Sequence, residues 1–283
     1  MEMTDVIRGD DHLSNTPKQI VVYNALGFKV PKFYHVPMIN NPSGKKLSKR
    51  DGAMDVMDYK NQGYLPEALL NFLVRLGWSN GDQEIFSMED MLELFDPSNI
   101  NKSASAYNAE KLLWLNSEYI KAVSNDRLIE ELKFFDLDLS HHPKRTELLD
   151  LSKQRAQTIV ELKASVNSIL EVPTEYEEAG VKKFVKEDTK DFLEKYLELL
   201  EKNKEELYNV ENVEALTKPF IAENGLKFPQ LFQPIRIALT GGTQAPSVYD
   251  IVAILGFSEV STRLKEALKR NFQNTWLFKN NLA

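Results

Sequence analysis

The sequence predicts a mostly α-helical protein that begins with a small α/β segment. Two patterns indicate this fold class. From about residue 55 onward, apolar side chains recur with the 3.6-residue period of amphipathic helices. Before residue 45, a strand, a helix and a second strand follow one another, which is the pattern of a βαβ unit. We therefore expect strands only near the N-terminus and helices elsewhere.

The N-terminal segment contains each part of that unit in order. A short strand ends over residues 5–8. Asn15 and Pro17 predict a helix start, because a capping residue followed by proline in the first turn is favoured there, and Gly27 predicts the helix end. Residues 33–39 (FYHVPMI) are aromatic and β-branched, so we expect the second strand at this position.

Three helices are expected between residues 55 and 125. Residues 66–76 carry leucines at helical spacing, and Gly77 predicts the end of this helix. Ser87 is a capping candidate for the next helix, which must end before Pro97. Residues 109–119 form the third helical pattern.

The remainder of the chain is predicted to be helical and rich in charge, without repeats or low-complexity tracts. Further helices are expected at residues 126–135, 144–170, 190–207 and 213–224, with breaks at 140–143, 172–174, 202–203 and 225–229.

Composition excludes several classes of protein. No run of about 18 apolar residues is present, so no membrane span is expected. No basic leader with an apolar core opens the chain, so we expect no secretory signal and a cytoplasmic location. Zero cysteines exclude disulfides and thiolate zinc sites. The pair His141-His142 lacks further ligands at metal spacing, so we expect a loop there and no metal site.

The net charge of −7 is unevenly distributed. Residues 1–60 carry 9 basic and 7 acidic side chains, residues 61–217 carry 18 and 31, and residues 218–283 carry 8 and 4. Both ends are therefore net positive. Local patches set phosphate affinity more than net charge does, so a nucleic-acid binder is compatible with this pattern. Chance asymmetry in a helical protein is the alternative.

A short basic loop is the most informative feature of the chain. Residues 41–44 (NPSG) predict a turn, and Lys45, Lys46, Lys49 and Arg50 then place four cations within six residues. Preorganised cations stabilise the charge that develops on a polyphosphate during group transfer. A solvated basic turn is the alternative interpretation.

The loop and its surroundings resemble a known family. Residues 46–50 (KLSKR) resemble the KMSKS motif of class I aminoacyl-tRNA synthetases. Other stretches are similar to bacterial-type glutamyl-tRNA synthetases, in the same order and over nearly the whole chain. These stretches are residues 6–19 (VIRGDDHLSNTPKQ), 64–73 (YLPEALLNFL), 76–78 (LGW), 111–116 (KLLWLN) and 233–241 (QPIRIALTG).

The resemblance implies a fold and an order of domains. A remnant of a class I α/β, Rossmann-like catalytic domain would be followed by helical stem-contact and all-α anticodon-binding domains. The expected divisions are residues 1–54 for the catalytic part with the KLSKR loop, 55–125 for the stem-contact domain, and 126–207 and 208–283 for two anticodon-binding subdomains.

The resemblance also implies an activity. ATP, accompanied by Mg2+, would activate L-glutamate to glutamyl-adenylate, and the 3′ end of tRNA(Glu) would then accept the glutamyl group. No zinc and no membrane would be involved, and we expect a monomer.

One departure from the family matters for this activity. The family carries a HIGH signature that helps to bind ATP, whereas none of the four histidines here stands in a His-x-Gly-His arrangement. We therefore expect a C-terminal portion of the enzyme, arising as a fragment, by internal initiation or from a mis-called start, and inactive by itself.

Two other functions remain open. The chain could be a non-catalytic tRNA-binding fragment that needs the missing half. It could also be the short relative that glutamylates a modified nucleoside in tRNA, although the long helical tail argues against this relative.

The resemblance assigns catalytic and ATP-binding residues. A lysine ammonium would compensate charge on the α-phosphate as the carboxylate attacks. A surface lysine is the alternative for Lys49, and a packing histidine is the alternative for His12. The expected catalytic residues are Lys46, Ser48, Lys49 and Arg50, and the expected ATP contacts are Lys49, Leu47 and His12.

Glutamate binding is assigned to the segment after the first strand. Arg8 resembles the family's arginine that grips the amino acid, because a guanidinium binds a carboxylate through two parallel hydrogen bonds. A structural ion pair with Asp10 or Asp11 is the alternative. These two carboxylates would hold the substrate ammonium or orient Arg8.

The tRNA contacts are assigned near the C-terminus. By resemblance, Arg236 and Thr240 face the anticodon, and their spacing places both on one face of a helix. A structural role for Arg236 is the alternative. Trp78, Trp114 and Tyr119 lie at helical apolar positions, so we expect core packing rather than base stacking.

Overall fold

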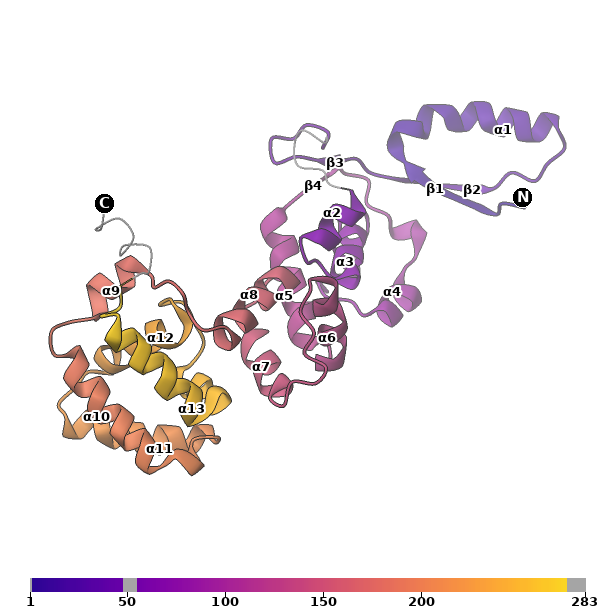
Figure 1. The fold of residues 1–283 in the computed structure, drawn as a ribbon. Coiled ribbons are helices and arrows are strands. Elements are labelled where there is room, and N and C mark those ends of the chain that lie inside the picture. The colour runs from indigo at the N-terminus through magenta and orange to yellow at the C-terminus, as the bar shows by residue number, and fades with distance from the viewer. Residues whose placement is uncertain (1, 48–54, 274–283) are drawn as a thin grey trace. The chain divides into compact units, whose positions relative to one another are not determined.

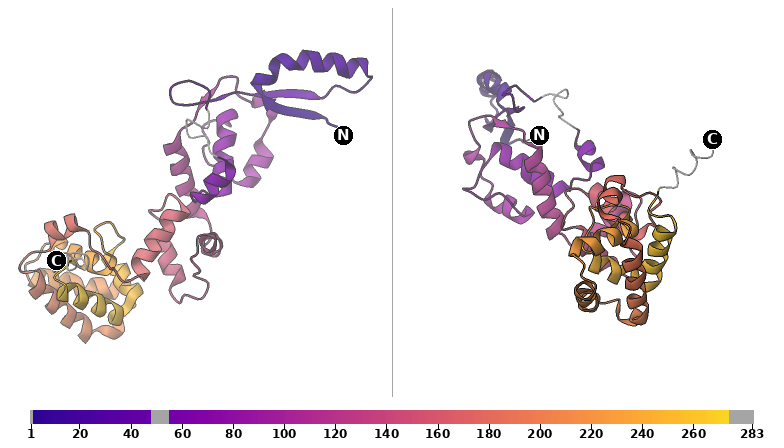
Figure 2. Two further views of the ribbon diagram at one scale, coloured as in Figure 1. Left: turned by 45° about the horizontal axis from the view of Figure 1, so that its top comes forward. Right: turned by 90° about the vertical axis from the view of Figure 1, so that its left-hand side faces the viewer.

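The computed structural model describes residues 2–47 and 55–273. The chain forms two compact units, Met1–Val123 with Gln157–Ile159, and Ser124–Ala156 with Val160–Ala283. Figures 1 and 2 show strands only in the first unit and helices throughout the second. The predicted fold class, mostly α after an N-terminal α/β segment, is confirmed.

The N-terminal segment is one βαβ unit (Figure 1). Strand β1 (Asp5–Gly9) leads through a 3-10 helix, η1 (Asp10–Asn15), into helix α1 (Thr16–Ala25), and strand β2 (Lys32–Val36) follows. The two strands pair in parallel, from Asp5 opposite Lys32 to Gly9 opposite Val36. Pro17 stands in the first turn of α1, as the sequence predicts.

The rest of the first unit is helical around a second parallel strand pair. Short strands β3 (Ile39–Asn40) and β4 (Ser105–Ala106) pair in parallel. Around them lie α2 (Val56–Asn61), α3 (Pro66–Gly77), α4 (Met88–Leu94), a 3-10 turn η3 (Pro97–Asn99) and α5 (Ala109–Ala122). A core of apolar side chains joins α2, α3 and α5, formed by Tyr59, Leu69, Phe72, Leu76, Leu112 and Leu115.

Two buried asparagines connect the helices of this unit. The Asn71 side chain accepts hydrogen bonds from the Phe86 backbone NH and the Tyr119 hydroxyl, both at 2.8 Å. The Asn116 side chain accepts from the Leu65 NH at 2.8 Å and donates to the Gln157 carbonyl at 2.6 Å. Because buried polar groups cost free energy unless they are paired, these contacts fix the loops that they reach.

The second unit is all-helical. Its helices are α6 (Asn125–Phe134), α7 (Arg145–Ser152), α8 (Ile159–Leu170), α9 (Glu178–Phe184), α10 (Thr189–Lys202), a 3-10 turn η4 (Lys204–Glu206), α11 (Val210–Glu223), α12 (Phe228–Thr240) and α13 (Val248–Lys269). One large core is shared mainly by α10 to α13 and includes Leu193, Tyr196, Leu200, Val213, Phe232, Ile235, Val252, Val260 and Leu264.

Three expectations from the sequence are wrong. The single strand expected over residues 33–39 is interrupted at Pro37 and Met38, and its two parts, β2 and β3, belong to different strand pairs. The single helix expected over residues 144–170 is broken between α7 and α8. There, the Arg155 guanidinium binds the Ala245 carbonyl and the Asn116 amide binds the Gln157 carbonyl, so tertiary contacts override the periodicity. Trp114 is 41% exposed rather than packed in the core, whereas Trp78 is 2% exposed as predicted.

The helices of the described residues are not membrane spans. Within the described residues, 2–47 and 55–273, no helix combines the length and the apolar character that a bilayer crossing requires.

Candidate functional site

The turn that leads into the basic loop is built around Asn41. Its side-chain Oδ1 accepts hydrogen bonds from the Ser43 backbone NH at 3.1 Å, the Ser43 hydroxyl at 2.7 Å and the Lys45 NH at 3.0 Å. The Asn41 NH in turn donates to the Lys45 carbonyl at 2.7 Å. Gly44 has φ of +80°, a conformation that glycine adopts without steric cost. The loop therefore starts from a fixed turn.

This turn is attached to the strand pair beneath it. The Leu47 NH donates to the Ile39 carbonyl at 2.9 Å, and Asn40 forms a β-bridge with Lys46. The Asn40 carbonyl also accepts a hydrogen bond of 2.8 Å from the NH of Tyr107, which stands just before α5. Lys46 is exposed at the end of this turn and Leu47 is half-buried. Three of the expected catalytic residues, Ser48, Lys49 and Arg50, lie outside the described residues.

Arg8 is held by three polar side chains, none of which is a carboxylate. Its Nη1 donates to the Gln19 side chain at 2.8 Å, its Nη2 donates to the Thr16 hydroxyl at 2.7 Å, and its Nε lies 3.3 Å from His35 Nε2. The guanidinium also lies over the Phe33 ring at 5.1 Å. Arg8 forms no ion pair with Asp10 or Asp11, so the structural ion pair considered from the sequence is absent. Because no carboxylate pairs with the half-buried Arg8, its charge stays available for an anionic ligand.

The acidic pair and His12 follow the carboxyl end of β1. Asp10 and Asp11 open η1, and Asp11 is exposed. His12 Nδ1 lies 3.3 Å from the Asn15 side-chain nitrogen, and the His12 ring is exposed rather than packed in a core. The alternative interpretation, in which His12 packs in a core, is therefore not supported by the structure.

One contact joins the two predicted parts of the site. The Lys46 ammonium lies 3.9 Å from the Asp11 carboxylate, with both side chains about half or more exposed. The expected glutamate-binding segment and the start of the basic loop therefore meet at the carboxyl ends of the β1 and β2 strands. Ligands of parallel α/β sheets bind at this edge.

The predicted tRNA-binding residues lie on one helix of the second unit. Arg236 and Thr240 are one turn apart on α12, and the Thr240 hydroxyl donates to the Arg236 carbonyl at 2.9 Å. Arg236 is half-buried, and its Nε is buried with no hydrogen-bond partner. Gly241 ends the helix with φ of +82°, and a Cβ there would lie 2.9 Å from the Glu175 carbonyl oxygen.

Sequence reasoning missed a second arginine at this place. Burial lowers the pKa of Arg236, and the nearby charge of Arg155 lowers this pKa further. The Arg155 Nη1 donates a hydrogen bond of 3.1 Å to the Ala245 carbonyl, five residues after the end of α12. Two guanidinium groups near each other repel unless an anion joins them. The available signal was the basic pair Lys153 and Arg155 within the helical pattern predicted over residues 144–170.

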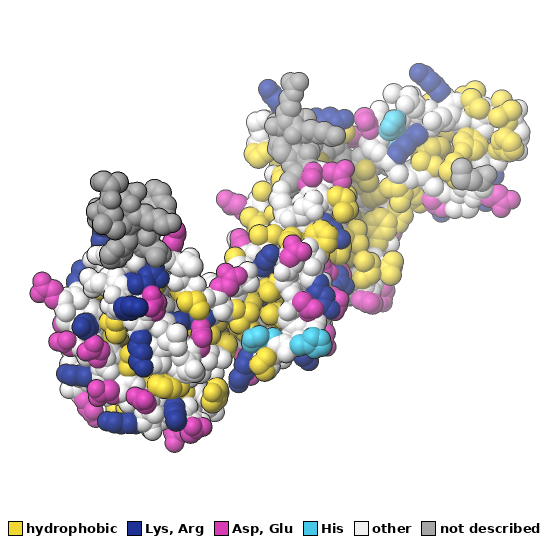
Figure 3. Space-filling model, viewed as in Figure 1, with side chains coloured by type: hydrophobic (Ala, Val, Ile, Leu, Met, Phe, Trp, Pro, Cys, Tyr) yellow, Lys and Arg dark blue, Asp and Glu magenta, His cyan; other side chains and the backbone are white. Residues whose placement is uncertain are grey.

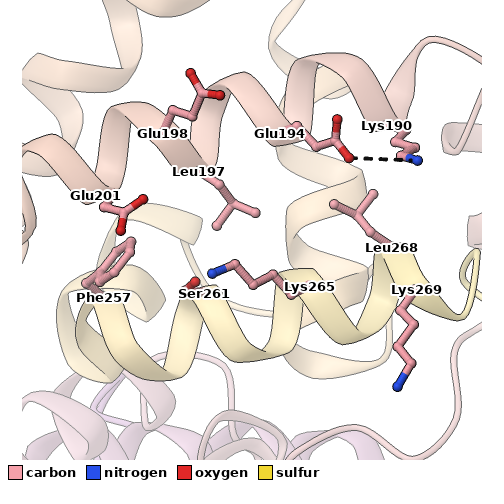
Figure 4. A pocket seen from close by; sticks show the side chains of 10 residues that line it. All are labelled: Lys190, Glu194, Leu197, Glu198, Glu201, Phe257, Ser261, Lys265, Leu268 and Lys269. Carbon is pink, nitrogen blue, oxygen red and sulfur yellow. Dashed lines mark ion pairs between the residues drawn. The ribbon is translucent and has the colours of Figure 1, made fainter.

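Another hollow of the second unit is mixed in charge. A cleft of about 380 Å³ between α10 and α13 has Leu197, Phe257 and Leu268 among its lining residues (Figure 4). Figure 4 also shows glutamates along the α10 wall and an ion pair of 3.8 Å between Lys190 and Glu194. Three lysines, Lys190, Lys265 and Lys269, balance the three glutamates of this cleft, so its lining has no excess of cations for a phosphate backbone. Within the second unit, Arg155 and Arg236 are the better candidates for a nucleic-acid contact.

Comparisons with known families cover both units. Residues 1–114 match the catalytic domain of class I tRNA synthetases for glutamate and glutamine (E and Q), and residues 106–268 match an anticodon-binding domain.

Curated relatives and solved structures agree with these matches. The chain is 82% identical over 275 residues to glutamate–tRNA ligase 1 of Aliarcobacter butzleri, which covers 97% of this chain and 59% of the relative. It is 52% identical to glutamate–tRNA ligase 1 of Campylobacter hominis, over 95% of this chain and 58% of the relative. A crystal structure of a glutamate tRNA ligase from Elizabethkingia meningosepticum in complex with its amino acid has a TM-score of 0.82 and 28% identity, over 94% of this chain and 57% of that chain.

The chain therefore spans somewhat more than half the length of the relatives that it matches. Along the chain, the match to the catalytic domain comes first and the match to the anticodon-binding domain follows. The chain belongs to the glutamate–tRNA ligase family of class I aminoacyl-tRNA synthetases, of which it carries a C-terminal portion.

Proposed function

We propose that this chain is the C-terminal part of a glutamate–tRNA ligase and supplies half of its adenylation site and its tRNA-binding helices. The whole enzyme uses ATP to activate L-glutamate as glutamyl-adenylate and transfers the glutamyl group to the 3′ end of tRNA(Glu). The observation that carries this proposal is the contact between Lys46 and Asp11, because it brings the basic loop to the carboxyl edge of the β1 and β2 pair.

The basic loop acts on the phosphates of ATP. Lys49, with Lys46, Ser48 and Arg50, compensates negative charge while the glutamate carboxylate attacks the α-phosphate and pyrophosphate departs. Leu47 and His12 complete the ATP contacts, and Mg2+ enters with ATP as part of the substrate. The fixed turn at Asn41 supports this role, since preorganised cations need no reorganisation during the reaction.

Arg8 binds a carboxylate of the substrate glutamate. The Thr16, Gln19 and His35 side chains orient the guanidinium and leave its positive charge unneutralised. Asp10 and Asp11 hold the substrate ammonium.

The second unit binds the anticodon part of tRNA. Arg236 with Thr240 on α12, and Arg155 beside them, attract phosphates or base edges. In this proposal, residues 1–54 act in glutamate activation and residues 55–125 contact the tRNA stem. Residues 126–207 and 208–283 bind the anticodon part. The protein works as a monomer in the cytoplasm.

A second candidate, tRNA binding without catalysis by this chain alone, is favoured by one observation. No described residue of β1, η1 or α1 is buried, so the α/β part that would surround ATP lacks a core of its own. Glutamate-dependent ATP–pyrophosphate exchange, measured with the chain alone and tRNA present, separates the two candidates. We expect no exchange above background. Exchange that Lys49→Ala abolishes would mean that the chain is catalytic by itself.

A further inference from the structure

The βαβ unit at the N-terminus exposes apolar side chains that folded proteins normally cover. Figure 3 shows hydrophobic side chains gathered over the part of the molecule that α1, β1 and β2 form. Scattered apolar residues on a surface are ordinary, but a contiguous patch indicates an interaction site. The members of this patch are more than half exposed on and just after α1: Val21 66%, Val22 56%, Leu26 63% and Phe28 62%.

The same unit has no core of its own. None of the described residues of β1, η1, α1 and β2 is buried. Within the described residues, β1 pairs only with β2, so each strand has one unpaired edge. Parallel sheets occur almost only with both faces covered, and a sheet of two strands is marginal by itself. The unit therefore needs further polypeptide to complete it.

The exposed face of α1 is also hollowed. A depression of about 390 Å³ has Val22, Tyr23, Leu26 and Phe28 in its lining, and Lys18 is its single charged member. Nucleic acids require clustered cations, so an apolar protein surface is the better occupant.

The comparisons identify that occupant. The chain spans 59% of its Aliarcobacter butzleri relative, and residues 1–114 match a class I catalytic domain. A parallel α/β domain buries its helices against neighbouring strands and its strands beneath helices on both faces. The region of the relative outside the match is thus the polypeptide that we expect to cover this face.

We propose that the exposed face of α1, with the strand edges beside it, binds the remaining part of a glutamate–tRNA ligase catalytic domain, and that this association needs no peptide bond between the two parts. The proposal rests on the proposed function, because it names the partner that completes the adenylation site. It predicts that the two parts assemble when they are made as separate chains.

Co-expression tests this assembly. The 283-residue chain is produced together with a tagged polypeptide containing the part of the Aliarcobacter butzleri ligase outside the matched region. We expect the tag to retain both chains in a ratio of about 1:1 through gel filtration, because each partner buries one complementary surface. A tagged chain that stays insoluble or elutes alone beside the soluble wild-type chain overturns the proposal.

Substitutions on the exposed face locate the surface. Val22→Asp and Leu26→Asp change exposed side chains, so each variant should keep its circular dichroism spectrum. Each should weaken the assembly by about tenfold or more, because it removes apolar burial and buries a charge. Leu92→Asp is the matched control, since Leu92 on α4 is 79% exposed in the same unit, and it should bind like wild type.

Two other results would contradict the proposal. Binding that neither α1 substitution weakens would place the interface elsewhere. A homodimer of the chain that dissociates in Val22→Asp would make this face a self-association surface. The tRNA affinity of the second unit is measured separately with Arg236→Ala, so a failure of tRNA binding counts against the proposed function and not against this assembly.

Discussion

The buried guanidinium of Arg263 on α13 donates a hydrogen bond of 2.7 Å to the Leu239 carbonyl at the end of α12. The same group donates to the Ile169 and Leu170 carbonyls at the end of α8, at 2.9 and 3.0 Å, and pairs with Glu259 at 2.7 Å. Helix ends leave carbonyls without partners, so one side chain satisfies two helix ends and holds three helices together. Those helices carry and surround the proposed tRNA contacts.

Replacing this arginine should destabilise the second unit strongly. Arg263→Met removes four charge-assisted hydrogen bonds, three of them to backbone carbonyls, and leaves buried carbonyls unpaired. We expect this loss to cost about 3 kcal/mol or more. The measurement is urea unfolding followed by circular dichroism at 222 nm. Lys265→Met, at an exposed position two residues away on α13, is the control and should unfold at the wild-type urea concentration. Equal midpoints for both variants would contradict the role of Arg263.

The bend within α13 predicts a second stability effect. Gly256 has φ of +71°, and a Cβ there would lie 2.7 Å from the Tyr208 ring. Gly256→Ala should cost about 1–3 kcal/mol, since both the backbone and the close contact oppose it. Gly225→Ala is the control, because Gly225 has φ of +61° but open space around its Cβ position. If the two variants lose equal stability in thermal unfolding, the Tyr208 contact contributes nothing.

Glu84 gives the first unit a dependence on acidic pH. Hydrogen bonds from Lys111 at 2.7 Å and Arg75 at 3.2 Å hold the pKa of Glu84 below its usual value, with the Lys111 bond the larger cause. A lowered pKa in the folded state means that the unfolded state binds more protons. The resulting stability is therefore present above the unfolded pKa and is lost as pH falls through the lower folded pKa.

Glu84→Gln tests this dependence. The variant should have a lower free energy of unfolding than wild type at pH 7. This difference in stability should shrink as pH falls below about 4, where glutamates in unstructured peptides become protonated. Glu93→Gln on exposed α4 serves as the matched control and should track the wild type at every pH. A Glu84→Gln deficit that is the same at pH 3 and pH 7 would rule out the ionised pairing as its cause.

The paired arginines of the second unit predict tRNA affinity. Arg236→Ala and Arg155→Ala should each weaken binding of a tRNA(Glu) transcript by about 1–3 kcal/mol in filter binding. Lys195→Ala, at an exposed position of α10, is the control and should leave affinity unchanged. A phosphate role predicts loss on every tRNA and a salt slope shallower by about one unit, whereas a base role predicts loss on the cognate anticodon only. Wild-type affinity and slope in the folded Arg236→Ala variant would make Arg236 structural.

Locally encoded features were predictable from the sequence. Pro66, leucines at helical spacing and Gly77 define α3 because a helix start, face and end each depend on nearby residues. The capping box of Ser87 with Asp90 at the start of α4 is equally local. The βαβ order at the N-terminus was predictable for the same reason.

Features that depend on contacts between distant parts of the sequence were not predictable. The break after α7 depends on Ala245 and Asn116, which lie far away in the sequence. The exposure of Trp114 could not be predicted either, because periodicity identifies a helix face but not what covers it. Likewise, the approach of Lys46 to Asp11 and the effect of the Arg155 charge on the pKa of Arg236 follow from tertiary structure alone. The roles of the individual site residues stay predictions.

The central claim, that this chain supplies the activating lysine of a glutamate–tRNA ligase, is tested most directly by single-turnover formation of glutamyl-adenylate. The protein to use is a full-length chain in which the missing region of the Aliarcobacter butzleri relative precedes this sequence. Lys49→Ala should slow adenylate formation by ~10²–10³ while tRNA affinity stays near wild type, and Lys29→Ala should match wild type in both. A Lys49→Ala rate within a few-fold of the wild-type rate would contradict the account.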